Sequence, residues 1–143
     1  HDFIGRAALE ARIDEPHRRK RWVEWDREDV AKIFASMYNE GDERYKYLDS
    51  PMSVYTACQF DRVEKDGRHV GNMNLSVYSS NTRSWISLGS LDADAQPGDE
   101  VVLHWGEPDG GHSRFYERHT PTTVKATVIE RPFLQSTEGS SNR

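Results

Sequence analysis

The sequence predicts a mainly β domain, a Greek-key or jelly-roll-like barrel of about six strands with one capping helix and an N-terminal helix. Two observations support this fold. Short runs of β-forming residues after residue 52 are separated by turn signals, among them Lys65-Asp66-Gly67-Arg68 and Pro97-Gly98-Asp99. Helical spacing of apolar residues occurs only near residues 2–12 and 26–38. With 143 residues, the chain is long enough to bury one core.

Both predicted helices lie near the start of the chain. Asp2 suits the N-cap of an amphipathic helix over residues 2–12, which has little to pack against locally. The run KRWVEW at residues 20–25 then favours a strand. Asp26 can cap the second helix, which should end near residues 39–41 and which places on one face Val30, Ile33, Phe34 and Met37.

The rest of the chain is predicted to form strands. A hairpin joins residues 53–63 to a strand that runs from His69 to about Tyr78. Ser79, Ser80 and Asn81 favour the next turn through local bonds between side chain and backbone. Further strands are predicted at residues 85–91, 100–106 and 122–130, with a long loop at 107–121. Residues 134–143 have the composition of a disordered tail.

The composition excludes several classes of protein. A net charge of −5 argues against a domain that binds nucleic-acid backbones. The basic cluster at residues 18–21 is interpreted as a solvent-exposed segment that leads into a strand. No apolar run approaches the length of a membrane span, and charged residues interrupt any secretory signal at the start. Cys58 is the single cysteine, so an internal disulfide is excluded and a reducing, cytoplasmic setting is expected.

The sequence offers no defensible catalytic or metal-binding group. The spacing of His104, His112 and His119 matches no zinc motif, and an acidic turn at residues 92–99 lacks the remaining ligands of a calcium loop. Cys58 lies among strand residues, where a lone cysteine usually packs as a small hydrophobe. No glycine-rich phosphate loop is present. We therefore expect neither a catalytic residue nor a metal site.

Four tryptophans leave one alternative open. They could stack on carbohydrate or on single-stranded nucleic acid, which would make the chain a stand-alone binding barrel. Their positions in strands favour core packing instead, because a small barrel must fill its interior with large side chains. The four residues are Trp22, Trp25, Trp85 and Trp105.

A family resemblance emerges between residues 71 and 91. Gly71 opens a strand, a polar turn brings Ser79 and Arg83, and an apolar strand from Ile86 ends at Gly89. This pattern resembles the C-terminal barrel domain of the aminomethyltransferase family, which is typified by the glycine cleavage T-protein. Three further features fit the same family: the opening Asp2 to Arg6 with Ala8-Leu9, Gly98 before a β-run, and Pro132-Phe133.

Three short motifs narrow the resemblance. They are Tyr78-Ser79-x-Asn81-x-Arg83, Trp105-Gly106-Glu107 and Glu117-Arg118-His119. Together they look like the branch of this family that contains tetrahydrofolate-dependent O-demethylases of aromatics such as vanillate and syringate. In that family three domains surround a folate cavity, and the first two hold most of the folate-binding residues.

The resemblance implies how this chain is organised. Residues 1–17 would be a helix and linker from a preceding domain, residues 18–133 the C-terminal barrel, and residues 134–143 a tail. The chain starts without Met inside an expected helix, so we expect a fragment. T-proteins place a Tyr near their C-terminus in the site, whereas the tail here has none.

The resemblance also implies a role. The fragment would be an accessory domain without catalysis of its own, in a parent that uses tetrahydrofolate; the fragment alone would need no cofactor. Its partners would be the N-terminal folate-binding domains of the same parent, with neither nucleic acid nor membrane involved. The candidate docking turn consists of Tyr78, Ser79, Asn81 and Arg83.

Overall fold

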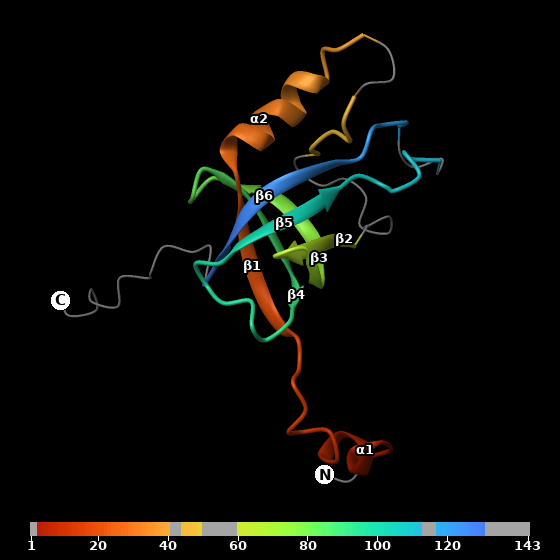
Figure 1. Ribbon diagram of the computed structural model, residues 1–143, viewed down its shortest axis with the longest axis vertical. Coiled ribbons are helices and arrows are strands. Elements are labelled where there is room, and N and C mark those ends of the chain that lie inside the picture. The colour runs from red at the N-terminus through yellow and green to blue at the C-terminus, as the bar shows by residue number, and fades with distance from the viewer. Residues whose placement is uncertain (1–2, 41–43, 50–59, 113–116, 131–143) are drawn as a thin grey trace, which may run out of the picture.

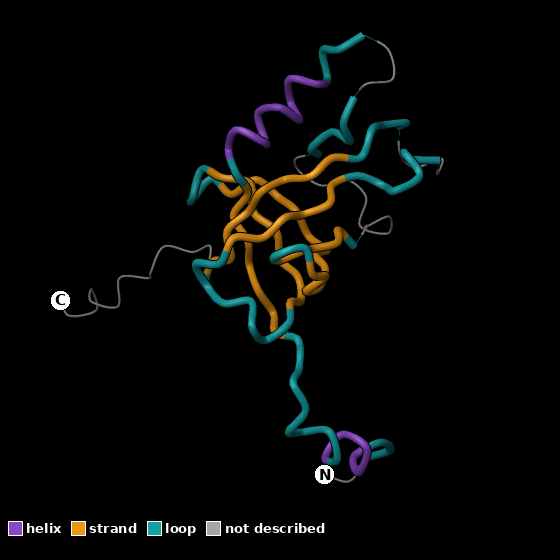
Figure 2. The backbone as a smooth tube through the Cα atoms, in the orientation of Figure 1, coloured by secondary structure: helices purple, strands orange, loops and turns teal. Residues whose placement is uncertain are grey.

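The computed structural model describes residues 3–40, 44–49, 60–112 and 117–130. Within them, six antiparallel strands close a barrel in the order β1-β4-β3-β2-β5-β6, which confirms the predicted fold class (Figures 1 and 2). Two short helices accompany the strands. The elements are α1 (Arg6–Glu10), β1 (Arg19–Trp25), α2 (Arg27–Ser36), β2 (Asp61–Lys65), β3 (Arg68–Ser79), β4 (Ser84–Leu91), β5 (Glu100–Trp105) and β6 (Thr122–Ile129).

The strand order contains a Greek key. β2, β3 and β4 are joined in sequence as hairpins. A long connection that contains α2 joins β1 to β2, and β1 lies beside β4 in the barrel. The tight turn between β2 and β3 has Asp66 at φ 52° and Gly67 at φ 75°, as a two-residue hairpin requires. β2 begins only at Asp61: Phe60 precedes it without strand structure, and residues 53–59 of the predicted strand, Cys58 included, lie outside the described residues. So do Pro132-Phe133 and the predicted tail.

The N-terminal helix is shorter than predicted. It covers Arg6–Glu10, and its N-cap is Gly5 at φ 95° without a side-chain cap, so the prediction of Asp2 as the cap was wrong. All of its residues are exposed, and Figure 1 shows α1 apart from the barrel. A short helix with neither a side-chain cap nor a packed face gains little to extend it. Leu9 in the helix is 63% exposed, and the apolar residues on either side of the helix, Phe3 and Ile13, are 54% and 69% exposed.

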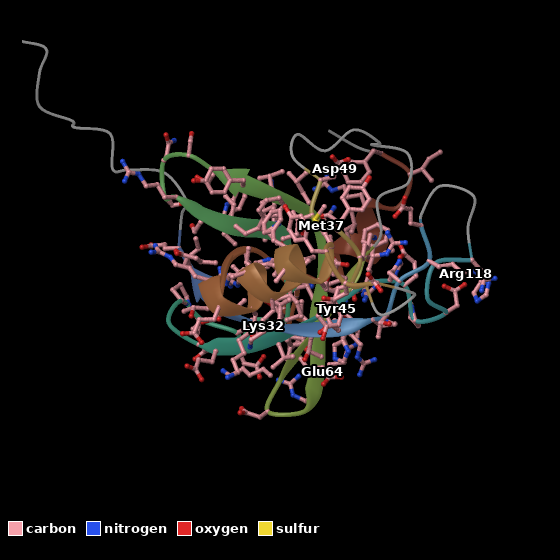
Figure 3. All side chains as sticks on the ribbon, turned by 90° about the horizontal axis from the view of Figure 1, so that it is seen from above. Lys32, Met37, Tyr45, Asp49, Glu64 and Arg118 are labelled. Atoms are coloured by element: carbon pink, nitrogen blue, oxygen red, sulfur yellow. The ribbon has the colours of Figure 1, made fainter. Side chains whose placement is uncertain are left out.

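The second helix begins as predicted. The Asp26 carboxylate accepts hydrogen bonds from the backbone N–H groups of Glu28 and Asp29, both at 3.0 Å. The helix lies across one end of the barrel (Figures 1 and 3). Of its predicted apolar face, Ile33 is buried, whereas Phe34 stays 41% and Met37 46% exposed.

Two glycines of the family pattern let neighbouring strands approach closely. Gly71 on β3 faces Leu91 of β4, and Gly89 on β4 faces Met73 of β3. A Cβ at Gly71 would lie 2.9 Å from the Leu91 Cα, and one at Gly89 would lie 2.6 Å from the Met73 Cα. Any larger residue would therefore push β3 and β4 apart. The sequence pattern has a structural cause at both positions.

Candidate functional site

One end of the barrel gathers most of the polar and aromatic features. Because the strands are antiparallel, β1, β3 and β5 end where β2, β4 and β6 begin. The same end carries α2, the β3–β4 turn, residues 44–49 and the loop that follows β5 (Figures 1 and 2). We call it the α2 end.

The predicted docking turn lies at the α2 end. Tyr78 is 50% exposed, and its ring centroid is 6.3 Å from that of Trp85. The Ser79 hydroxyl accepts a hydrogen bond from the backbone N–H of Thr82 at 3.3 Å, the local bond that a serine turn was predicted to make. Asn81 and Arg83 are exposed, and Arg83 has φ 52°, a conformation that residues other than glycine rarely adopt. The turn thus presents an aromatic ring and a guanidinium to solvent.

Beneath this turn, three tryptophans form a layer across the barrel. Trp25 lies 5.2 Å from Trp105 and 6.4 Å from Trp85 between ring centroids. The three are 2%, 7% and 4% exposed respectively, so they pack in the core, as predicted, and present no open stacking platform. Trp22 is half-buried.

A lysine and a glutamate form an ion pair at the edge of this layer. Lys46 Nζ lies 2.8 Å from Glu107 Oε1, with the two side chains only 13% and 15% exposed. The ammonium also stands 5.0 Å from the centroid of the Trp105 ring. The Trp105 indole N–H donates to the backbone carbonyl of Lys46 at 2.7 Å. Residues 44–49 are thereby held against the end of β5.

His119 joins two of the motifs that suggested the O-demethylase branch. Its Nδ1 lies 2.8 Å from the Glu117 carbonyl, which can only accept, so Nδ1 carries the proton. Nε2 then accepts from the backbone N–H of Glu107 at 2.9 Å. A Cβ on Gly106 or on Gly111 would lie 2.9 Å from ring atoms of His119. The motifs at residues 105–107 and 117–119 thus form one contact.

The Glu107 carboxylate has a second oxygen inside this contact. Oε2 lies 2.8 Å from His119 Nε2 but has no hydrogen-bond donor in the part of the chain that the structure describes.

A buried aspartate faces the same end. Asp61 is 3% exposed, and burial raises the pKa of its carboxyl from 3.8 to about 7, with Lys46 opposing the rise and Glu107 adding to it. A chain of hydrogen bonds leads to it through the barrel. The Trp25 indole donates to Ser87 Oγ at 2.7 Å, Ser87 Oγ lies 2.7 Å from Ser76 Oγ, and Ser76 bonds the Asp61 side chain.

Sequence reasoning missed Asp61 and Lys46 as members of a cluster. The available signal was the position of Asp61 two residues before the core residue Val63, which places both side chains on the inner face of one strand. The three histidines do not meet: His104 lies 3.3 Å from Glu64 Oε2, His112 is exposed, and His119 belongs to the contact above. Among the described residues, no three His, Cys, Asp or Glu side chains are placed to hold a metal ion.

Comparison with known proteins shows which proteins this chain is similar to. No family model matches the chain. The chain is similar to part of a syringate O-demethylase. That Sphingobium protein is 41% identical over 135 residues, which cover 93% of this chain and 29% of the relative. A sesamin methylene transferase from a Sinomonas species is 29% identical over 159 residues, covering 98% of this chain and 35% of the relative.

These matches confirm the resemblance to O-demethylases that the three motifs predicted. The chain spans 29% and 35% of the length of the two curated relatives, so most of each relative lies outside the matched region. No helix in the described ranges is long and apolar enough to cross a bilayer.

Proposed function

We propose that this chain is the C-terminal accessory barrel of a longer, tetrahydrofolate-dependent O-demethylase or methyltransferase of the aminomethyltransferase family. In that protein, a methyl group would pass from an aromatic methoxy substrate to tetrahydrofolate in domains that precede residue 1. The observation that carries the proposal is the 41% identity to a syringate O-demethylase over only 29% of that protein. Residues 1–17 would link to the preceding domain, residues 18–133 would form the barrel, and residues 134–143 a tail.

The structure of the α2 end supports a role in positioning a neighbouring domain and not in catalysis. Its aromatic layer is buried, and Lys46, Glu107 and His119 are engaged with one another, which suits a rigid surface that positions a neighbouring domain. The exposed turn at Tyr78 and Arg83 would dock onto the folate-binding domains. We further propose a cytoplasmic location, and partners limited to the parent's own domains.

Isothermal titration of the 143-residue chain with tetrahydrofolate tests the accessory role. We expect no tight binding, because the folate-binding groups would lie in the preceding domains. Micromolar affinity for the chain alone would contradict the proposal. The titration is repeated after thermal unfolding and refolding are shown to be reversible, so that a misfolded sample is not counted as a negative result.

Segment exchange tests the family assignment. The matched 135 residues of the Sphingobium protein are replaced by this chain, and syringate O-demethylation is compared with that of a variant lacking the segment. The hybrid should retain activity that the deletion loses. Equal loss in both, with a soluble and folded hybrid, would argue against an equivalent role for this chain.

A further inference from the structure

A groove at the α2 end lies between the helix and the β3–β4 turn. It encloses about 480 Å³, and its walls include Trp25, Val30, Phe34, Tyr78 and Trp85. Figure 3 looks down on this end, where α2 crosses the strands. The groove includes two of the four residues of the predicted docking turn, Tyr78 and Arg83.

The groove exposes aromatic surface that the fold itself does not cover. Phe34 is 41% and Tyr78 50% exposed, and both rings contact the buried Trp85, at 6.2 and 6.3 Å between centroids. Covering such rings with an apolar side chain would remove a large area from water. The apolar floor therefore suits an aliphatic or aromatic side chain.

Trp85 also differs from its neighbours in the aromatic layer. The indole N–H groups of Trp25 and Trp105 donate to Ser87 and to Lys46. The Trp85 N–H is buried and finds no acceptor among the described residues. A buried donor without a partner costs free energy, so an oxygen atom brought in by an occupant would be stabilised here.

Two arginines line the groove. Arg27 lies in the first turn of α2 and Arg83 ends the β3–β4 turn, and neither forms an ion pair with a described carboxylate. The nearest acids on the helix are already used, because Asp26 caps it and Asp29 binds Lys32. Glu28 is exposed beside Arg27. On a chain with a net charge of −5, this pair of cations is suited to carboxylates on a partner.

We propose that this groove binds a segment of the preceding part of the same parent polypeptide, in which an apolar side chain is flanked by Asp or Glu. The inference rests on the proposed function, since both relatives extend well beyond the matched region. The apolar side chain enters between Phe34 and Tyr78, and the carboxylates pair with Arg27 and Arg83. A segment tethered to residue 1 has a high effective concentration, so a groove of this size suffices to hold it.

Photo-crosslinking in the full-length polypeptide tests the occupant. A p-benzoylphenylalanine replaces Phe34, and the same residue replaces Asp66, at the tip of the β2–β3 turn, as a control. Mass spectrometry should place the Phe34 crosslink on a peptide upstream of residue 1 that carries Asp or Glu beside an apolar residue. Crosslinks to a second copy, only to residues 1–143, or no more frequent than from position 66 would overturn the inference.

Charge reversal tests the arginines. Arg27→Glu with Arg83→Glu should lower the upstream crosslink yield about fivefold, since two exposed ion pairs are lost. Arg19→Glu with Lys20→Glu changes the net charge equally at the start of β1 and should leave the yield within about twofold. Equal yields in the two variants would refute the role of the arginines.

The two proposals can fail separately. Demethylation of a methoxylated aromatic acid with tetrahydrofolate is measured on the unsubstituted polypeptide. Activity without an upstream crosslink refutes the groove assignment alone, whereas an upstream crosslink in a polypeptide without this activity refutes the proposed function alone.

Discussion

His119 Nε2 lies 2.8 Å from Glu107 Oε2 across a loop that separates the two residues by twelve positions. The contact depends on two glycines, because a Cβ at Gly106 would lie 2.9 Å from the imidazole and one at Gly111 equally close. Gly106 and Gly111 therefore pack closely against one histidine ring, and this packing can be tested by filling the space at either glycine.

Gly106→Ala should destabilise the fold more than Gly98→Ala. The two glycines have nearly equal φ values, 99° and 96°, but only Gly106 lies against His119. The shared backbone strain should cost about 1–2 kcal/mol in each variant. Steric conflict with the imidazole should add about 1 kcal/mol or more in Gly106→Ala alone. Urea unfolding measures both, and equal losses would show that the ring moves aside freely.

Asp61 should make stability fall as the pH rises. Because burial raises the pKa of its carboxyl to about 7 in the folded chain, the folded state holds a proton that the unfolded state releases above pH 3.8. The stabilising contribution of that proton is complete below the unfolded pKa and is lost as the pH rises through about 7. A shift of this size corresponds to at most about 4 kcal/mol.

Asp61→Asn isolates this effect. The amide mimics the protonated carboxyl, so the variant should match the original chain near pH 3, below the unfolded pKa, and be more stable near pH 8. Asp66→Asn at the exposed hairpin tip removes a carboxylate of the same type outside the core and serves as the matched control. The free energy of unfolding is measured in urea across this range. A variant profile parallel to that of the original chain would mean that Asp61 ionises normally in the fold.

The Lys46–Glu107 pair should show strong coupling. Lys46→Met and Glu107→Gln each remove one charge of a largely buried ion pair, and each should cost about 2 kcal/mol. The double variant should cost less than the sum, with a coupling energy of about 1 kcal/mol or more. A parallel cycle on Arg62 and Glu64, whose side chains are 52% and 23% exposed, should give less than about 0.5 kcal/mol. Similar coupling in the two cycles would contradict the burial argument.

Tryptophan fluorescence should report a buried layer. Trp25, Trp85 and Trp105 should emit at short wavelength and resist acrylamide, whereas Trp22→Phe should remove most of the quenchable signal. Cello-oligosaccharides and oligo-dT should leave the spectrum unchanged. Quenching by either ligand would favour the alternative of a stand-alone binding barrel.

Local chemistry made much of the fold predictable. Asp66-Gly67 has the left-handed backbone that its turn type needs, and Asp26 has the side chain that a helix N-cap needs, so both features could be read directly. The predicted length of α1 was too great, because the spacing of apolar residues indicates the apolar face of a helix but not whether another element packs against that face. Its face is exposed throughout the described structure.

The polar cluster was less predictable because barrel closure creates it. Lys46 lies in an irregular segment without periodicity, and it reaches Glu107 across 61 positions. Asp61 gains its raised pKa from burial, which depends on the closed set of strands rather than on its neighbours in sequence. The turn between β3 and β4 could be predicted from Ser79 and its neighbours, whereas the groove beside it required the position of α2.

The pairing of β1 with β6 has a mechanical consequence. Trp22 faces Ile129 and Trp25 faces Ala126, so the chain enters and leaves the barrel at the end opposite α2. Tension applied through Arg19 and Ile129 would load the hydrogen bonds of this ladder one after another, starting from that end. The β1–β6 ladder should therefore unzip at low pulling force, whatever the resistance of the barrel to heat or urea.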